Sequence, residues 1–118
     1  MTDVFLITES RYLNPNNGDW YVKNILKEDD LLSKELKNLN ISSSRLSWDS
    51  NQGLERGRCA LFRTPWNYFQ KLDEFVGFLE KWQERVIFIN SSDLVLWNLN
   101  KTYLLDLNMK GINIPETF

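Results

Sequence analysis

The 118-residue chain predicts a single α/β domain over residues 1–118, with a three-layer, doubly wound and mainly parallel sheet of four to five strands. Two observations predict this class. Short runs that are apolar throughout, such as Val4 to Thr8, are typical of strands buried on both faces of a parallel sheet. Segments with apolar residues at helical spacing alternate with these runs. Such alternation indicates strands joined by right-handed helical crossovers.

The first half of the chain predicts two strands and a helical segment between them. Val4 to Thr8 is the first strand, and a turn signal at Asn14 to Gly18 follows it. One or two helices are expected from about Trp20 to Leu39. The acidic run Glu28 to Asp30 is interpreted as the solvated start of a helix, where carboxylates favour the dipole, with a metal-binding pair as the alternative. Ile41 to Trp48 alternates in polarity and predicts the second strand.

The second half predicts two further strands and a helix between them. Arg58 to Thr64 is the third strand, and Pro65 ends it. The next segment predicts an amphipathic helix through a stripe of apolar residues: Phe69, Leu72, Phe75, Val76, Leu79 and Trp82. Val86 to Ile89 is wholly apolar and predicts the fourth strand.

The remaining segment is ambiguous at first and then helical. Leu94 to Trp97 has the propensity of a strand, but Ser91 to Asp93 supplies an N-cap for a short helix there. A further helix is expected from about Lys101 to Lys110, with Gly111 as its C-terminal stop.

Composition excludes several classes of function. The net charge of −2 and the pI of about 5.1 argue against a partner that is nucleic acid or an anionic membrane. The chain has no histidine and a single cysteine, Cys59, which rules out Ser-His-Asp and Cys-His catalysis and any internal disulfide. Cys59 is interpreted as a core residue rather than a nucleophile. No stretch has the length of a membrane span and no secretion signal is visible, so a cytoplasmic protein is expected.

The phosphate-binding motifs common in this fold class are also missing. No Gly-x-Gly-x-x-Gly follows the first strand, and no P-loop is present. An acidic pair at the end of the first strand, which a receiver domain needs, is absent as well, because Asp29 and Asp30 lie far downstream.

The last third of the chain has an ordered set of weak motifs. An asparagine follows the fourth strand, then come a short helix, a polar-Lys pair, a helix that ends in Gly-Ile, and Pro-x-Thr. These are Asn90, Ser92 to Trp97, Asn100-Lys101, Tyr103 to Ile112 and Pro115-Glu116-Thr117. This order resembles the junction at which a pre-ATP-grasp domain passes into an ATP-grasp fold, at about residues 111–118.

An upstream run resembles one branch of that family. Arg63-Thr64-Pro65-Trp66-Asn67-Tyr68 is similar to the Arg-Ser-x-Trp-Asp-Tyr run of the glutathione-synthetase-like and RimK-like ligases, which include the cycloserine-biosynthesis type. Tyr21-Val22-x-Asn24 and Leu46-x-Trp48-Asp49 fit the same branch. The sequence departs from the pattern at Asn67, where an Asp is usual, and at Asn100, where an acidic residue is usual. These departures concern substrate contacts rather than the fold.

The resemblance implies the N-terminal, substrate-side domain of an ATP-dependent carboxylate–amine ligase. In such ligases ATP activates a carboxylate, and an amine then attacks the acyl phosphate. ATP and Mg²⁺ would be held mostly by C-terminal ATP-grasp domains, so this chain alone is expected to bind neither and to be inactive. An isolated domain would also expose the apolar surface on which those domains pack, and self-association as a homodimer is therefore expected.

Two candidate site residues are charged and lie at strand ends. Arg63 could hold a substrate carboxylate through its guanidinium, or it could form a structural ion pair with Asp49 or Asp73. Glu9 follows the first strand and could bind a substrate amine, or it could be a solvated loop carboxylate.

Three further candidates follow from the resemblance. Lys101 matches a family lysine that contacts ATP phosphates, with a solvated lysine at a helix start as the alternative. Trp66 and Tyr68 could line a substrate cleft, with core or interdomain packing as the alternative.

Two other functions stay open at this point. The chain could be a stand-alone, non-catalytic α/β binding or interaction module. It could also be a small-ligand enzyme that uses Arg63 and Glu9 directly, although no nucleophile supports this function.

Overall fold

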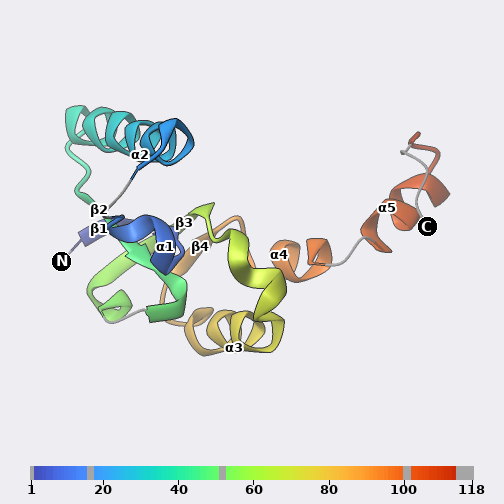
Figure 1. Cartoon of the computed structure of the whole chain (residues 1–118). Coiled ribbons are helices and arrows are strands. Elements are labelled where there is room, and N and C mark those ends of the chain that lie inside the picture. Colours follow the sequence, from blue (N-terminus) through green and yellow to red (C-terminus); the bar gives the residue numbers. More distant parts are fainter. Residues whose placement is uncertain (1, 16–17, 51–52, 100–101, 114–118) are drawn as a thin grey trace.

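The structure, a computed structural model, describes residues 2–15, 18–50, 53–99 and 102–113. Its centre is a four-stranded sheet in the order β2-β1-β3-β4, and every neighbouring pair of strands is parallel (Figure 1). The strands are β1 (Thr2–Thr8), β2 (Ser43–Ser47), β3 (Gly57–Thr64) and β4 (Ile87–Ile89). The predicted α/β class with a parallel sheet is confirmed.

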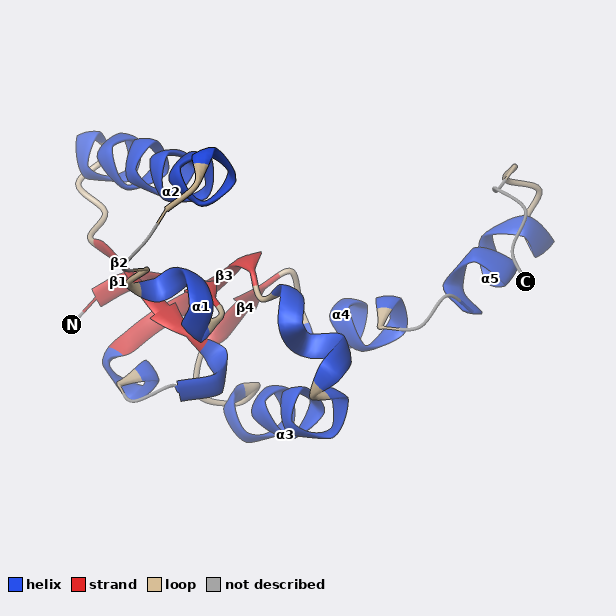
Figure 2. Cartoon of the chain, in the orientation of Figure 1, coloured by secondary structure: helices blue, strands red, loops and turns tan. Residues whose placement is uncertain are grey.

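The helices are α1 (Ser10–Leu13), α2 (Trp20–Asn38), α3 (Leu72–Trp82), α4 (Ser92–Asn98) and α5 (Thr102–Met109). Of these, α2 and α3 lie on opposite sides of the sheet (Figure 2). Short 3-10 turns follow β2 (Trp48–Ser50), precede β3 (Leu54–Arg56) and follow β3 (Trp66–Gln70).

The predicted helical segment after β1 is one continuous helix, α2, preceded by the short helix α1. Asp19 caps α2, because its carboxylate accepts a hydrogen bond from the Val22 N–H at 3.0 Å. The interpretation of Glu28 to Asp30 as a solvated helix start was wrong. These residues lie inside α2, and Asp29 is only 1% exposed because it lies one helical turn after buried Ile25 on the face that contacts the sheet.

The two faces of the sheet carry different cores. On one face, α3 packs over alternate strand residues such as Phe5, Ile7 and Ala60, and α4 adds partly buried apolar side chains. On the other face, α2 covers Leu6, which is fully buried, and reaches the arginines of β2 and β3. This alternation is the pattern expected of a three-layer domain.

The segment after β4 resolves the ambiguity at Leu94 to Trp97 in favour of a helix. The Ser91 hydroxyl accepts a hydrogen bond from the Leu94 N–H at 3.4 Å and so caps α4. Val95, Leu96 and Leu99 then pack toward the core on the α3 face.

The wholly apolar run at β4 does not mark a strand buried on both faces. Phe88 is buried against the α3-side core, but Ile87 is 69% exposed and Ile89 is 45% exposed. β4 is an edge strand, and the chain leaves it toward α4 on the face that is already covered. Cys59, on β3 beside Ile87, is likewise only partly buried, and this burial raises the pKa of its thiol.

Candidate functional site

The strand order creates a switch point between β1 and β3. From β1 the chain passes outward to β2, whereas from β3 it passes outward in the opposite direction to β4. Ligands of open α/β sheets bind beyond the carboxyl ends of strands at such a point. Thr8 and Thr64 meet there through a hydrogen bond between their hydroxyls, and Glu9 and Pro65 follow them in the chain. This edge of the sheet is therefore the candidate functional site.

Glu9 lies at the switch point and is fully buried, contrary to the alternative of a solvated loop carboxylate. One carboxylate oxygen accepts from the Arg11 guanidinium, whose side chain is largely exposed. The other oxygen, Oε2, is buried and has no hydrogen-bond partner among the described residues. Because a buried acceptor without a partner is costly, this oxygen suits a donor such as an amine or a water molecule.

Trp66 belongs to an aromatic cluster beside this edge. Its ring lies 5.9 Å from the Tyr12 ring and 6.0 Å from the Tyr21 ring, measured between centroids. Tyr12 is buried, which raises the pKa of its phenol, whereas Trp66 is partly exposed. The cluster joins α1, α2 and the turn after β3 into one surface.

Tyr68 lies in a different place, on the wall of a small cavity of about 160 Å³ between the Trp66–Gln70 turn and α4. The cavity is mostly apolar, and two amide side chains add polar groups to it. Its lining residues are Phe62, Pro65, Tyr68, Phe75, Asn90, Val95, Asn98 and Leu99. Trp66 is not among them, so the structure separates the two aromatic residues that the sequence motif placed together.

Asp49 organises the site, and the sequence did not single it out for this role. Its carboxylate accepts hydrogen bonds from the Ser10 N–H and hydroxyl, both at 3.0 Å, and from the Asn67 amide at 3.0 Å. Asn67 in turn accepts from the Trp48 indole at 2.8 Å. This chain of bonds ties the end of β2 to α1 and to the turn after β3. The family motif contains the pairs Trp48-Asp49 and Trp66-Asn67, and these pairs could have pointed to the role of Asp49.

Burial and hydrogen bonding oppose each other in setting the pKa of Asp49. Burial, the largest effect, raises the pKa of the carboxyl. The hydrogen bonds from Asn67, Ser10 and the backbone together outweigh it, so the pKa lies below its ordinary value.

Arg63 is ion-paired with Asp29, not with the expected Asp49 or Asp73. Its Nε lies 2.9 Å from one oxygen of Asp29, and the Nε of Arg45 lies 2.9 Å from the other. Arg63 points to the α2 face, where Asp29 lies in the middle of the helix, and its side chain is 31% exposed. Two guanidinium groups therefore share one buried carboxylate, and one Arg45 nitrogen, Nη2, is buried without a partner among the described residues.

Lys101 lies outside the described residues. Over the described ranges, no three His, Cys, Asp or Glu side chains gather in a way that could hold a metal ion, and no helix is long and apolar enough to cross a membrane.

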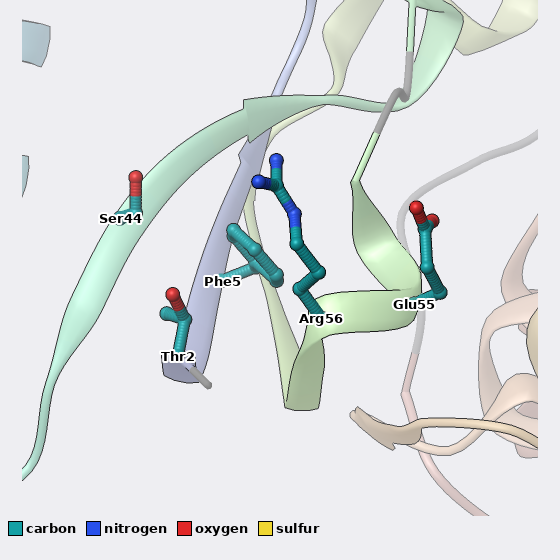
Figure 3. A pocket seen from close by; sticks show the side chains of 5 residues that line it. All are labelled: Thr2, Phe5, Ser44, Glu55 and Arg56. Carbon is teal, nitrogen blue, oxygen red and sulfur yellow. The ribbon is translucent and has the colours of Figure 1, made fainter.

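A larger cavity, of about 590 Å³, lies at the opposite edge of the sheet. Thr2, Phe5, Ser44, Glu55 and Arg56 line it, and Figure 3 shows Arg56 extending alongside the Phe5 ring. These residues mark the amino ends of β1 and β2 and the turn before β3. Because ligands of such sheets bind at the carboxyl ends of the strands, this cavity is the weaker candidate despite its size.

The parallel sheet with a polar switch point between β1 and β3 defines the chain as a doubly wound α/β domain, a class in which ligands bind at the carboxyl ends of the strands. The chain belongs to the family of D-cycloserine synthetase DcsG N-terminal domains, whose model matches residues 4–90. This match confirms the expectation that the chain is related to the N-terminal domain of a ligase.

A curated protein and a solved structure, both named DcsG, show the same relationship. The cycloserine biosynthesis protein DcsG of Streptomyces lavendulae is 29% identical over 87 residues, which are 73% of this chain and 29% of that protein. The crystal structure of D-cycloserine synthetase DcsG superposes with a TM-score of 0.76 at 25% identity, over 94% of this chain and 34% of that one. The chain thus spans about a third of the length of these relatives.

Proposed function

We propose that this chain is the substrate-side N-terminal part of an ATP-dependent ligase that joins a carboxylate to an amine, within the ATP-grasp class and its glutathione-synthetase-like and RimK-like branch. The match of residues 4–90 to the N-terminal domain of a synthetase carries the proposal. The chain spans only about a third of the length of its relatives. This agrees with the proposal, because most of such an enzyme would lie outside these residues.

We expect ATP and Mg²⁺ to be held mostly by groups outside these residues. Among the residues that the structure describes, no three His, Cys, Asp or Glu side chains gather in a way that could hold a metal ion. In this class ATP supplies the activation of the carboxylate, and the groups that hold it would come from further domains, joined by Lys101 of this chain. No catalytic residue is assigned to the described part of the chain.

The chain's own contribution would be to bind and orient substrate at the switch point. The free Oε2 of Glu9 would accept a hydrogen bond from a substrate amine. The exposed part of the Arg63 guanidinium would face a substrate carboxylate, while Asp29 holds its Nε. Trp66 and Tyr68 would border the substrate on either side of the turn after β3.

Nucleotide binding tests the division between this chain and the rest of a ligase. We expect ATP with Mg²⁺ to leave the thermal midpoint of the 118-residue chain unchanged. A longer form that includes the following domains should be stabilised by about 2.7 kcal/mol when the nucleotide is at a hundredfold its Kd. Calorimetric titration of both forms measures this directly. Tight binding by the 118 residues alone would contradict the proposal, and absence of binding by the longer form would favour a stand-alone module.

The substrate role of Glu9 is tested in the longer form by Glu9→Gln. Glu9→Gln should raise KM for the amine substrate by at least tenfold, because the charged acceptor is lost. Glu55→Gln, an exposed carboxylate at the opposite edge, is the matched control and should leave KM unchanged. An unchanged KM in Glu9→Gln would remove Glu9 from the site without affecting the assignment as a ligase domain.

A further inference from the structure

The small cavity between the Trp66–Gln70 turn and α4, here termed the α4 cavity, lies at the carboxyl ends of two neighbouring strands. Phe62 lies near the end of β3, Pro65 follows this strand, and Asn90 follows β4 directly. β3 and β4 pair in parallel, so they end side by side. Figure 1 shows α4 beside the turn that follows β3. This is the edge at which open α/β sheets bind ligands, so the α4 cavity is placed as a binding site would be.

The α4 cavity has a buried floor, apolar walls and a polar rim. Phe75 of α3 is 1% exposed and forms the floor. The half-buried walls come from two parts of the chain, the end of β3 with its turn and the helix α4: Phe62, Pro65 and Tyr68, and Val95 and Leu99. The amide side chains of Asn90 and Asn98 are exposed and mark the rim.

Contacts outside the cavity hold both walls in place. Asn67 fixes the turn after β3, because its side chain bonds to the Trp48 indole at 2.8 Å and to the Asp49 carboxylate at 3.0 Å. The start of α4 is tied to the end of α3, since the Ser92 hydroxyl donates to the Gln83 amide oxygen at 3.1 Å. A ligand would therefore enter a cavity that is already formed, and the chain would lose little conformational freedom on binding.

The size and lining of the cavity suit a single six-membered ring. Its volume is about 160 Å³, and apolar cavities of about 150 Å³ bind benzene. The ring centroids of Phe62 and Tyr68 lie 5.8 Å and 5.4 Å from that of Phe75. Aromatic rings attract one another at such separations, so a ligand ring beside these three would extend the cluster.

The cavity favours an uncharged ligand that has one polar group. The residues that line it carry no charge, so a charged group would lose water there without gaining a counter-charge. The Tyr68 hydroxyl and the amides of Asn90 and Asn98 form no hydrogen bond with other side chains in the part of the chain that the structure describes. These three groups are therefore available to a hydroxyl or a carbonyl of the ligand.

We propose that the α4 cavity binds a small, uncharged six-membered ring that carries one hydroxyl or carbonyl group. The ring packs on Phe75 between Tyr68 and α4, and its polar group bonds to the amides of Asn90 and Asn98 at the rim. Binding of such a ring by this chain does not depend on the ligase assignment. In the ligase proposed above, and only if that proposal holds, the cavity would select the uncharged part of the substrate.

Phenol is a suitable probe, because its hydroxyl has a pKa near that of tyrosine and stays neutral at neutral pH. Nuclear magnetic resonance of the 118-residue chain should show saturable shifts of the Val95 and Leu99 methyl signals, with a Kd in the millimolar range. Nuclear Overhauser contacts should join these methyl groups to the ring protons of phenol. Benzoate, which has the same ring and a negative charge, should bind more weakly by about tenfold or more.

A variant that fills the cavity tests its location. Val95→Phe should weaken phenol binding by about tenfold or more, because the new ring would occupy the ligand's space. Leu94→Phe is the matched control, since Leu94 is the preceding residue of α4, is 40% exposed and does not line the cavity. It should bind phenol like the unmodified chain. Circular dichroism verifies that both variants fold.

A second variant tests the polar rim and leaves the core untouched. Asn98→Ala changes an exposed residue at the end of α4, so folding should persist. It should weaken phenol binding by about threefold, because one hydrogen bond is lost. Binding of toluene, which has a methyl group in place of the hydroxyl, should not change. An equal loss for both probes would overturn the role of the amide.

The proposal is overturned if phenol leaves the Val95 and Leu99 methyl signals unchanged up to its solubility limit. It is likewise overturned if benzoate binds as tightly as phenol, or if folded Val95→Phe binds phenol like the unmodified chain. These measurements involve neither ATP nor a longer form of the chain. Their failure would therefore leave the proposed ligase function standing, and failure of the nucleotide test would leave the α4 cavity standing.

Discussion

Asp29 is the residue that holds the α2 face together. It is buried in the middle of α2, and its two oxygens bind Arg45 of β2 and Arg63 of β3, so one carboxylate links a helix to two strands on either side of β1. Burial of such a group is favourable only while both partners are present. The same contact fixes Nε of Arg63 and leaves the rest of its guanidinium partly exposed at the candidate site.

We expect Asp29→Asn to lower the free energy of unfolding by about 3–5 kcal/mol, because two partly buried guanidinium groups would lose their common counter-charge. Urea denaturation followed by circular dichroism measures this. Asp30→Asn is the control, since Asp30 is exposed and pairs only with Lys34 one turn away, and its effect should stay within about 0.5 kcal/mol. Equal effects of the two substitutions would show that the ion pairs of Asp29 contribute nothing to folding.

Asp49 makes the folding stability of the chain depend on pH. Its pKa is lowered in the folded state, since hydrogen bonds from Asn67 and Ser10 outweigh the opposing effect of burial. A carboxyl with a lowered folded pKa adds stability above its ordinary pKa of about 3.9 and loses it as the pH falls through the folded value. Asp3 shifts in the same direction through hydrogen bonds from Ser42.

The Asp49→Asn variant should therefore show a shallower loss of unfolding free energy below about pH 4 than the unmodified chain. Urea titrations at several pH values between neutral and strongly acidic conditions measure the slope. The Asp3→Asn variant tests the contribution of Asp3 separately. An acid slope in Asp49→Asn identical to that of the unmodified chain would contradict the role assigned to these hydrogen bonds.

At the scale of elements, the contact between β1 and β3 depends on a missing side chain. A Cβ on Gly57 would lie 2.3 Å from the Phe5 ring, and Phe5 is buried in the core. The ring can therefore pack flat on the start of β3 only because position 57 is glycine. Gly77, inside α3, meets nothing within 4 Å and has no comparable constraint.

These two glycines should respond in opposite ways to alanine. Gly57→Ala should destabilise the chain by about 1–3 kcal/mol through overpacking. Gly77→Ala should stabilise it by about 0.5–1 kcal/mol, because alanine is the better helix former and leaves the unfolded chain less freedom. Thermal and urea unfolding of both variants measure the difference. Stabilisation by Gly57→Ala would mean that Phe5 has room to move.

At the scale of the whole molecule, the domain is asymmetric in how it covers its sheet. α3 and α4 cover one face, whereas on the other face α2 reaches β3 only at Arg63 among the described contacts, and Ile87 and Ile89 of β4 are exposed. The candidate substrate residues are also divided between the faces, with Arg63 toward α2 and Tyr68 toward α4. A substrate that contacts both would have to span the carboxyl edge at the switch point. This division supports a role for the chain as one wall of a larger site.

The sequence by itself determined the local structure and its class. Apolar runs and helical spacing located all four strands and the helices α2, α3 and α5, and the Ser91 cap raised the helical alternative at Leu94 to Trp97, which the structure confirmed as α4. The sequence also placed Glu9 and Trp66 at the carboxyl edge of the sheet. Glu9 follows directly after the first apolar run, and Trp66 follows Pro65, which ends β3. Periodicity and capping are properties of neighbouring residues, so a single chain segment contains this information.

Only the tertiary structure decided which surfaces and charges meet. The sequence interpreted Asp29 as part of a solvated helix start, and the structure reversed this, because burial depends on where α2 lies across the sheet. The apolar run of β4 predicted a strand, but only the structure showed that Ile87 and Ile89 are exposed. The structure also paired Arg63 with Asp29 rather than Asp49, and it tied Asp49 to Asn67 and Ser10. Ion-pair partners and the burial of a strand face depend on residues that are far apart in the sequence. Local sequence patterns therefore cannot predict them.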